Sequence, residues 1–392
     1  MTATMTSRLR VAAALNFHPV DRVPADLNLS YHAYLKVCES TGFPAAPLPK
    51  PNLAMEVCPD PRLYEELGVD VYSVKFGSGV TFDGTLKETV TDGWGIPYRL
   101  VRQNSGALYE VDGHPLAAAS RADLESYPWP AAPTPAMKAS LRDEAKRMYD
   151  TTALALCGRF GAPIMEVAAG LLGSEEWLVR LLHEPEFTET LLRKIESVAT
   201  AWDLAGIEAC GEYLAILKVS GEDFGCQKSL LFSPETIRGF LLPILRRRWD
   251  AVHAALNACG SAAKVMLHTC GAVKPIVPDL MAAGIEVLDP IQPQAFGMNP
   301  GELHAAFGGK IVFHGGIDVQ DVLPHGTPER VGEHAREVVT ALHGLEGGYI
   351  LSPSHNVQAD VPPQNLMAML KTARWHERHI PDILSGGRAR TD

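Results

Sequence analysis

The sequence predicts an α/β fold, a (β/α)8 TIM-type barrel with N-terminal additions. After about residue 140, short apolar runs typical of buried strands alternate steadily with stretches that carry helix signals. Eight such candidate strands occur along the whole chain. Apolar strands that alternate with helices indicate parallel βαβ units covered on both faces, and eight units favour a barrel over its main rival, a doubly wound sheet.

The elements follow in a regular order. The candidate strands lie at 23–29, 69–76, 152–160, 213–220, 262–269, 285–290, 310–316 and 347–354. The candidate helices lie at 138–151, 174–184, 186–210, from 233 onward, 272–283, around 300–307, 328–343 and 363–378. Ser233 before Pro234 predicts an N-cap followed by proline at the first helical position, and Ser174 before two glutamates predicts an N-cap with an acidic first turn.

We expect one barrel domain over residues 1–385, with 1–22 and about 77–137 as peripheral additions and 386–392 as a flexible tail. The proline-rich stretch at 127–136 fits either a linker or an excursion within one domain. The N-terminal apolar patch VAAAL is too short for a membrane span and lacks a cleavage site, so we expect a short amphipathic helix of a cytoplasmic protein.

Composition narrows the classes of function. Lys and Arg total 35 against 46 Asp and Glu, and the formal charge of −11 argues against nucleic-acid and anionic-membrane partners, which need a basic surface. The seven cysteines are odd in number and scattered, so we expect reduced thiols rather than a disulfide framework. No Gly-rich phosphate-loop pattern is present in the sequence.

Polar residues gather just after the predicted strands, where a barrel carries its chemistry. They are Glu222, Asp223, Cys226, Gln227, His268, Cys270, Asp289, Gln292, His314, Asp318, Ser352, His355, Asn356, Gln358 and Asp360. His268 and Cys270 alternate on one side of an extended segment, so both could bind one ion, with His355 as a third ligand. The simpler interpretation is a buried structural cysteine beside a histidine bonded to backbone.

The aspartates have similar alternatives. Asp223 could cap a turn, and Asp289 precedes Pro290 in an ordinary strand-ending dipeptide. Asp223, Asp289 and Asp360 are nevertheless the candidate catalytic residues, because each could orient a substrate or hold a metal-binding histidine from behind.

Several stretches, taken in order, resemble the uroporphyrinogen decarboxylase superfamily. The matching pieces are HPVDRVP (18–24), DGWG (92–95), 219–238, VMLHTCGAV (265–273), IEVLDPIQP (285–293), 311–323 and 349–366. The resemblance is to the methyltransferase branch, which includes methylcobamide:coenzyme M methyltransferases and the methyltransferases of bacterial O-demethylase systems. It implies a (β/α)8 barrel. The arginine pair of the family's true decarboxylases (RQAGR) has no counterpart in residues 22–37, and no aspartate ends the second strand, which disfavours porphyrinogen decarboxylation.

The resemblance also implies a metal. The zinc methyltransferases of this family carry His-x-Cys after the fifth strand and a further cysteine after the eighth. This sequence keeps His268 and Cys270, and His355 stands where the second cysteine would be. A site with one thiolate instead of two would be more Lewis acidic and would push less electron density onto a bound thiolate, which disfavours coenzyme M as the methyl acceptor.

The sequence-based hypothesis is a zinc-dependent methyltransferase that moves a methyl group between a small methoxy or thiol compound and a corrinoid. Nothing in the sequence resembles a cobalamin-binding domain, so the corrinoid would come from a partner protein; we also consider a homodimer. One alternative is a decarboxylase or lyase acting on a small carboxylic acid, with Arg99, Arg159 or Lys218 at the barrel mouth. A second is a metal-free, tetrahydrofolate-linked methyltransferase in which His268 and His355 act as acid–base residues. The third is a non-catalytic ligand-binding barrel.

Overall fold

A computed structural model describes residues 4–45, 49–76, 86–103 and 106–375. Its centre is a curled parallel sheet of seven strands in the order β1-β5-β6-β7-β8-β9-β10. These strands are β1 (Val71–Val74), β5 (Ala155–Gly158), β6 (Leu214–Gly221), β7 (Lys264–His268), β8 (Val287–Ile291), β9 (Val312–Ile317) and β10 (Tyr349–Pro353). Each of them lies within one residue of a range predicted to be a strand, and the predicted TIM-type barrel is confirmed.

The eighth predicted strand, residues 23–29, closes the barrel between β10 and β1. Ala25 forms a parallel bridge with Leu351, and the Asp70 amide donates a 2.7 Å hydrogen bond to the Ala25 carbonyl. Pairing stays short on this segment because Pro24 has no N–H and because the Ala25 N–H bonds to the Asp70 carboxylate instead of to a neighbouring strand.

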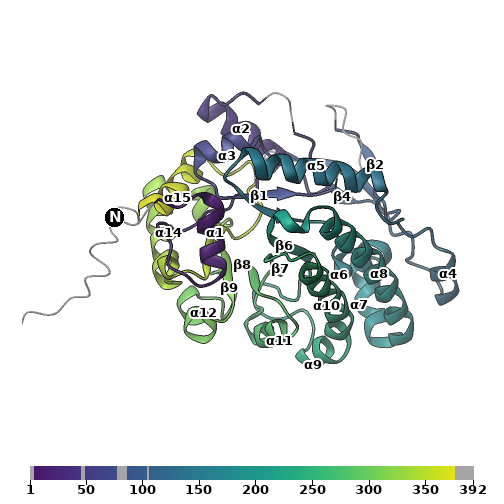
Figure 1. The fold of residues 1–392 in the computed structure, drawn as a ribbon. Coiled ribbons are helices and arrows are strands. Elements are labelled where there is room, and N and C mark those ends of the chain that lie inside the picture. Colours follow the sequence, from purple (N-terminus) through teal and green to yellow (C-terminus); the bar gives the residue numbers. More distant parts are fainter. Residues whose placement is uncertain (1–3, 46–48, 77–85, 104–105, 376–392) are drawn as a thin grey trace, which may run out of the picture.

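Helices surround the sheet (Figure 1). They are α5 (Pro135–Thr151), α6 (Ile164–Leu172), α7 (Ser174–His183), α8 (Pro185–Cys210), α9 (Pro234–Thr236), α10 (Leu242–Ala258), α11 (Val277–Ala282), α12 (Pro300–Phe307), α13 (Val322–His325), α14 (Pro328–Ala341) and α15 (Pro363–Trp375). Short turns of 3-10 or π helix lie at η1 (Gly211–Tyr213), η2 (Ile237–Leu241), η3 (Lys274–Ile276) and η4 (Gly344–Glu346). None of the described helices is long and apolar enough to cross a bilayer.

Two helix starts test the cap predictions. The Ser233 hydroxyl accepts the Thr236 N–H, so this N-cap is confirmed. The N-cap prediction for Ser174 was wrong, because Gly173 is the N-cap and Ser174 is the first helical residue, but the predicted acidic first turn is confirmed by Glu175 and Glu176. Gly173 has φ +92°, a conformation that favours glycine and lets α7 follow α6 directly.

The remaining elements lie around the barrel. They are α1 (Ser7–Leu15), α2 (Tyr31–Thr41), α3 (Pro61–Leu67), α4 (Arg121–Ser126) and an antiparallel sheet of β2 (Thr89–Thr91), β3 (Pro97–Gln103) and β4 (Gly106–Val111). The DGWG stretch forms the turn between β2 and β3. The expected flexible tail at 386–392 and the end of the last predicted helix lie outside the described residues.

The barrel interior has an apolar layer below a polar one. Val71, Ala155, Cys157, Ile216, Met266, Val287, Val312 and Ile350 form one buried cluster, which also includes Val11 and Leu15 of α1. Helix α1 therefore covers the N-terminal end of the barrel. Successive side chains along a strand point to opposite faces of the sheet, so the next inward-pointing position lies two residues along the strand. On β6 to β10 these positions are Lys218, His268, Asp289, His314 and Ser352.

Candidate metal centre

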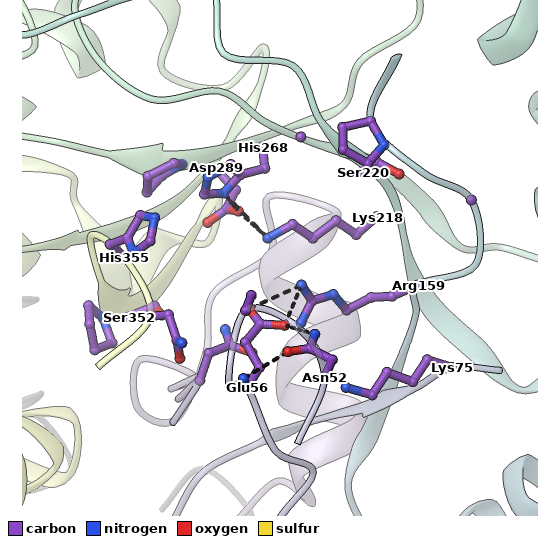
Figure 2. A pocket seen from close by; sticks show the side chains of 18 residues that line it. Asn52, Glu56, Lys75, Arg159, Lys218, Ser220, His268, Asp289, Ser352 and His355 are labelled. Carbon is purple, nitrogen blue, oxygen red and sulfur yellow. Dashed lines mark hydrogen bonds and ion pairs between the residues drawn. The ribbon is translucent and has the colours of Figure 1, made fainter. Parts of the chain in front are cut away.

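A cavity of about 430 Å³ opens at the C-terminal ends of the strands (Figure 2). It lies above the polar layer, as expected for a TIM-type barrel. The residues that line it are Asn28, Asn52, Ala54, Glu56, Lys75, Arg159, Gly161, Pro163, Lys218, Ser220, Gly221, His268, Asp289, Pro290, Ser352, Pro353, His355 and Asn356. An irregular segment near residue 55 also contributes to the wall, through Asn52, Ala54 and Glu56.

His268, Cys270 and His355 converge at this cavity. One ligand atom from each lies within 4.8 Å of the others. The His268 Nε2 and Cys270 Sγ atoms are 3.3 Å apart, and the His268 and His355 rings lie edge to face with centroids 5.9 Å apart. Two imidazole nitrogens and one thiolate are ligands that zinc accepts, and three protein ligands leave a fourth position open. The residues therefore fit a catalytic zinc ion.

A carboxylate fixes the orientation of His268. The Asp289 Oδ2 atom lies 2.8 Å from His268 Nδ1, so that nitrogen carries the proton and Nε2 keeps a free lone pair on the side of Cys270. Asp289 is held in turn by Lys218 Nζ at 2.7 Å and by His314 Nδ1 at 2.6 Å. The second nitrogen of His314 lies 3.1 Å from Asp26 Oδ2. Lys218, Asp289, His314 and Asp26 thus form a chain of hydrogen-bonded side chains behind the candidate ligand His268.

The charges in this chain are set by burial and pairing. Burial opposes ionisation of Asp289, but Lys218, His314 and His268 hold its pKa well below the usual value. Burial also disfavours the imidazolium of His314, but Asp289 and Asp26 raise its pKa to about 9. Asp289 is therefore ionised near neutral pH, and His314 is a cation beside it.

Asp223 fixes the backbone of a second candidate ligand, Cys270. Its Oδ1 atom accepts the Cys270 N–H at 2.9 Å, which fixes the loop after β7. Burial, followed by the charges of Asp223 and Asp289, raises the pKa of the Cys270 thiol. A cation bound between Cys270 and the histidines would oppose this effect and favour the thiolate.

Asp360, the third predicted catalytic aspartate, lies apart from the others. It is exposed in the turn after β10, and it is not among the described residues that line the cavity. The structure brings Asp223 and Asp289 to the candidate metal centre and leaves Asp360 outside.

Several residues of the site had no assigned role in the sequence analysis. His314 and Asp26 belong to the chain behind His268, and the inward spacing along β9 was the signal for His314. Arg159 pairs with Glu56 at 3.0 Å, and Asn52 Nδ2 donates to Glu56 at 3.1 Å. Asn52 and Glu56 come from an irregular segment, where no sequence pattern predicts which side chains point inward.

Cations also line the cavity. Lys75, Arg159 and Lys218 all face it, whereas Arg99 lies on β3 and pairs with Asp112 at 3.2 Å. Burial opposes ionisation of Glu56, but Arg159, Lys75 and Lys218 lower its pKa to about 2. Among the described residues Lys75 has no direct ion pair.

Comparison with known proteins gives relatives of two kinds. A uroporphyrinogen decarboxylase from Pelodictyon phaeoclathratiforme is 24% identical over 203 residues, which are 50% of this chain and 52% of that protein. A methylated-thiol–coenzyme M methyltransferase from Methanosarcina mazei is 29% identical over 154 residues, 39% of this chain and 36% of that protein. The match thus spans about half or less of the length of these curated relatives.

A solved structure shares the fold. A methyltransferase from Methanosarcina mazei superposes with a TM-score of 0.66 at 18% identity, over 95% of this chain and 99% of that one. Residues 114–376, well over half of the chain, match the family described as uroporphyrinogen decarboxylase (URO-D). The resemblance seen in the sequence is confirmed, and the chain belongs to the URO-D family.

Proposed function

We propose that this protein is a zinc-dependent methyltransferase that moves a methyl group between a small methoxy or thiol compound and a corrinoid. The observation that carries the proposal is the convergence of His268, Cys270 and His355 at the open end of the barrel. The relatives named as methyltransferases support it. The missing second cysteine favours an acceptor or donor other than coenzyme M.

The chain's own residues have defined parts in this proposal. Asp289 accepts a hydrogen bond from His268 Nδ1 and so presents Nε2 to the ion, while Lys218 neutralises the buried Asp289 carboxylate. Asp223 anchors the backbone of Cys270. When bound, zinc would lower the pKa of a substrate thiol or stabilise the oxygen anion left as a methyl group departs. The methyl group is transferred without its bonding electron pair, which stays on the substrate heteroatom when the substrate is the donor.

The corrinoid would be carried by a separate protein that docks over the barrel mouth. Phe296 and Leu231, which are 77% and 52% exposed, lie in the segments that follow β8 and β6. The Phe296 N–H bonds to the Gln227 carbonyl, so these two segments are joined. Apolar side chains of this kind at the mouth would suit such a partner.

Metal content tests the proposal first. Protein purified without added zinc should hold about one zinc per chain, and His268→Ala, Cys270→Ala and His355→Ala should each lose it. His325→Ala and Cys259→Ala, at exposed positions outside the cavity, are the matched controls and should keep it. Asp289→Asn should retain the site with about 10- to 100-fold weaker zinc binding, measured by competition with a chromophoric chelator.

Activity then separates the hypotheses. Methyl transfer to a free corrinoid in its reduced state should follow zinc content across these variants. A wild-type protein that stays free of zinc after zinc is supplied contradicts the mechanism. Methyl transfer that persists after chelation would favour the tetrahydrofolate-linked alternative, in which His268 and His355 act as acid and base.

One observation favours a second candidate function, a decarboxylase or lyase acting on a small carboxylic acid. Lys75, Arg159 and Lys218 line the same cavity and could bind a carboxylate. Arg159 and Lys218 are already paired with Glu56 and Asp289, which leaves Lys75 as the cation best placed for a ligand. Release of carbon dioxide from small carboxylic acids, lost in Lys75→Met, would favour this alternative.

A further inference from the structure

A buried glutamate caps helix α6 from outside the helix. Pro163 is the N-cap residue, and its side chain accepts no hydrogen bond from the helix. The two oxygens of Glu222, in the segment after β6, accept the Ile164 and Met165 N–H groups at 2.8 and 3.0 Å instead. Glu222 is fully buried. The free N–H groups at a helix N-terminus stabilise a carboxylate, so this place suits a negative charge.

A second glutamate, Glu166, lies in the first turn of α6 and bonds in the opposite direction. Its Oε1 atom accepts the Asp223 N–H at 3.0 Å. Its Oε2 atom is buried, and no group among the described residues bonds to it. Asp223 in turn accepts the Cys270 N–H at 2.9 Å. Glu166 is therefore linked to the candidate ligand Cys270 through a single residue, while half of its carboxyl group stays unpaired.

The buried cation of this region is already paired with another residue. Arg248 of α10 binds Asp203 of α8 at 2.7 Å and donates to Ser220 Oγ at 3.2 Å. Asp203 also accepts the Gly161 N–H at 2.8 Å, and a Cβ atom at Gly161 would lie 2.4 Å from an Arg248 nitrogen. The contacts around Arg248 are therefore close and complete, and within the described ranges no Lys or Arg pairs with Glu166.

The two glutamates differ in their support for a negative charge. Burial raises the pKa of Glu222 to about 7, although its two N–H donors and Arg248 oppose the rise. Burial, followed by the charges of Glu222 and Asp223, raises the pKa of Glu166 well above the usual value. Glu166 has one donor where Glu222 has two, and one of its oxygens is unpaired. A proton shared by this pair therefore resides on Glu166.

A neutral acid at this place suits the metal centre better than a carboxylate. Burial and then the charges of Asp223 and Asp289 already raise the pKa of the Cys270 thiol. A further negative charge behind the same loop would make the thiolate harder to form. A protonated Glu166 still accepts the Asp223 N–H through its carbonyl oxygen, so it anchors the loop without adding charge.

We propose that Glu166 is a positioning residue of the metal centre, that it stays protonated near neutral pH, and that it fixes Cys270 through Asp223. Its Oε1 atom is the carbonyl oxygen that accepts the Asp223 N–H, and Oε2 carries the proton. The inference rests on the proposed function for the role of Cys270 as a ligand. The place of the proton depends on the buried carboxyl groups and not on the metal.

Stability at two pH values tests where the proton lies. A carboxyl group whose folded-state pKa is raised makes the fold less stable as the pH rises from 4.5, the ordinary value, toward the folded-state value. Glu166→Gln, which imitates the neutral acid, should escape this loss. Urea denaturation should give it a folded-to-unfolded ratio about 10-fold or more above that of the wild type at pH 8, because one pKa unit is tenfold. The excess should shrink toward pH 5.

The same substitution at the other glutamate is the matched comparison. Glu222→Gln places an amide N–H against one of the N–H groups of α6, so it should lower the ratio at both pH values or prevent folding. Glu39→Gln, at an exposed position of α2, should change nothing. A Glu166→Gln variant no more stable than the wild type at pH 8, or more stable by the same factor at both pH values, would overturn the inference.

Zinc affinity tests the positioning role separately. In chelator competition Glu166→Gln should keep the wild-type affinity, because its amide oxygen still accepts the Asp223 N–H, whereas Glu166→Leu should weaken it about 10-fold. Equally weakened binding in both variants would mean that the charge of Glu166 is needed, contrary to the inference.

Hydrogen exchange at the Cys270 amide tests the anchor without the metal. Exchange should be faster in Glu166→Leu than in the wild type and unchanged in Glu166→Gln. Equal exchange in all three proteins would contradict the link through Asp223. If the wild type binds no zinc, the proposed function fails, while the exchange and the pH dependence of stability still decide the place of the proton and the anchoring of the loop.

Discussion

Two buried ionic networks lie at opposite ends of the barrel, and they differ in whether they leave a ligand atom available at the cavity. At the N-terminal end, Arg10 binds Asp21 and Asp70 at 2.7 Å each, and Arg22 also binds Asp70 at 2.7 Å. Asp70 in addition accepts the Ala25 N–H, so its carboxylate is saturated. We call this set of Arg10, Asp21, Arg22 and Asp70 the closed network.

The open network, Lys218, Asp289, His268, His314 and Asp26, lies at the C-terminal end. It is equally bonded on its inner side, but His268 Nε2 faces Cys270 and the cavity. The difference shows how one barrel separates stability from chemistry. Opposite charges balance completely where α1 covers the barrel, whereas ligand atoms stay available where the strands end.

The largest expected effect comes from breaking the closed network. Asp70→Asn keeps the size of the side chain but leaves two buried arginines without their shared carboxylate. We expect the free energy of unfolding to fall by about 3–5 kcal/mol, the cost of removing one partner from a buried ionic network, as measured by urea denaturation. Asp112→Asn, at the exposed pair with Arg99, is the control and should cause little loss. An equal loss in both variants would contradict the closed role of this network.

The open network should respond to pH. The folded-state pKa of His314 is raised from 6.5 to about 9, so its stabilisation is fully present below pH 6.5 and is lost as the pH rises through about 9. The loss should approach about 3 kcal/mol over that window. His314→Gln should remove most of this pH dependence of the free energy of unfolding, as measured by urea denaturation at each pH.

The closed network should show the opposite dependence. Burial works against ionisation of Asp21, but Arg10 and two backbone N–H groups lower its pKa below 3.8. Its contribution is present above pH 3.8 and is lost as the pH falls through the folded-state value. Asp21→Asn should reduce the acid loss and leave the alkaline loss caused by His314 unchanged. If one variant altered both the acid loss and the alkaline loss of stability, the two networks would not be independent.

The sequence predicted the barrel because its strands and helices follow from local patterns, whereas the place of His355 beside His268 and Cys270 depended on the barrel itself. Alternation of apolar strands and helices located the seven strands of the main sheet and the segment that closes it. Period-two spacing placed His268 and Cys270 together. The contacts around Gly161 could not be predicted, because Asp203 and Arg248 meet there from segments far apart in the sequence. The irregular segment that carries Asn52 and Glu56 has no periodicity that would predict which of its side chains point inward.

The smallest expected effect concerns two aspartates that the sequence placed on an equal footing. Asp223 accepts the Cys270 N–H, whereas Asp360 is exposed beyond the residues that line the cavity. Asp360→Asn should change the free energy of unfolding by no more than about 0.5 kcal/mol and leave zinc affinity unaltered. Asp223→Ala, which removes the acceptor of the Cys270 N–H, should weaken zinc binding about 10- to 100-fold, because the loop that carries Cys270 loses its anchor. Chelator competition on both variants makes the comparison. Weaker zinc binding in Asp360→Asn would mean that the turn after β10 closes over the metal centre when the ion is bound.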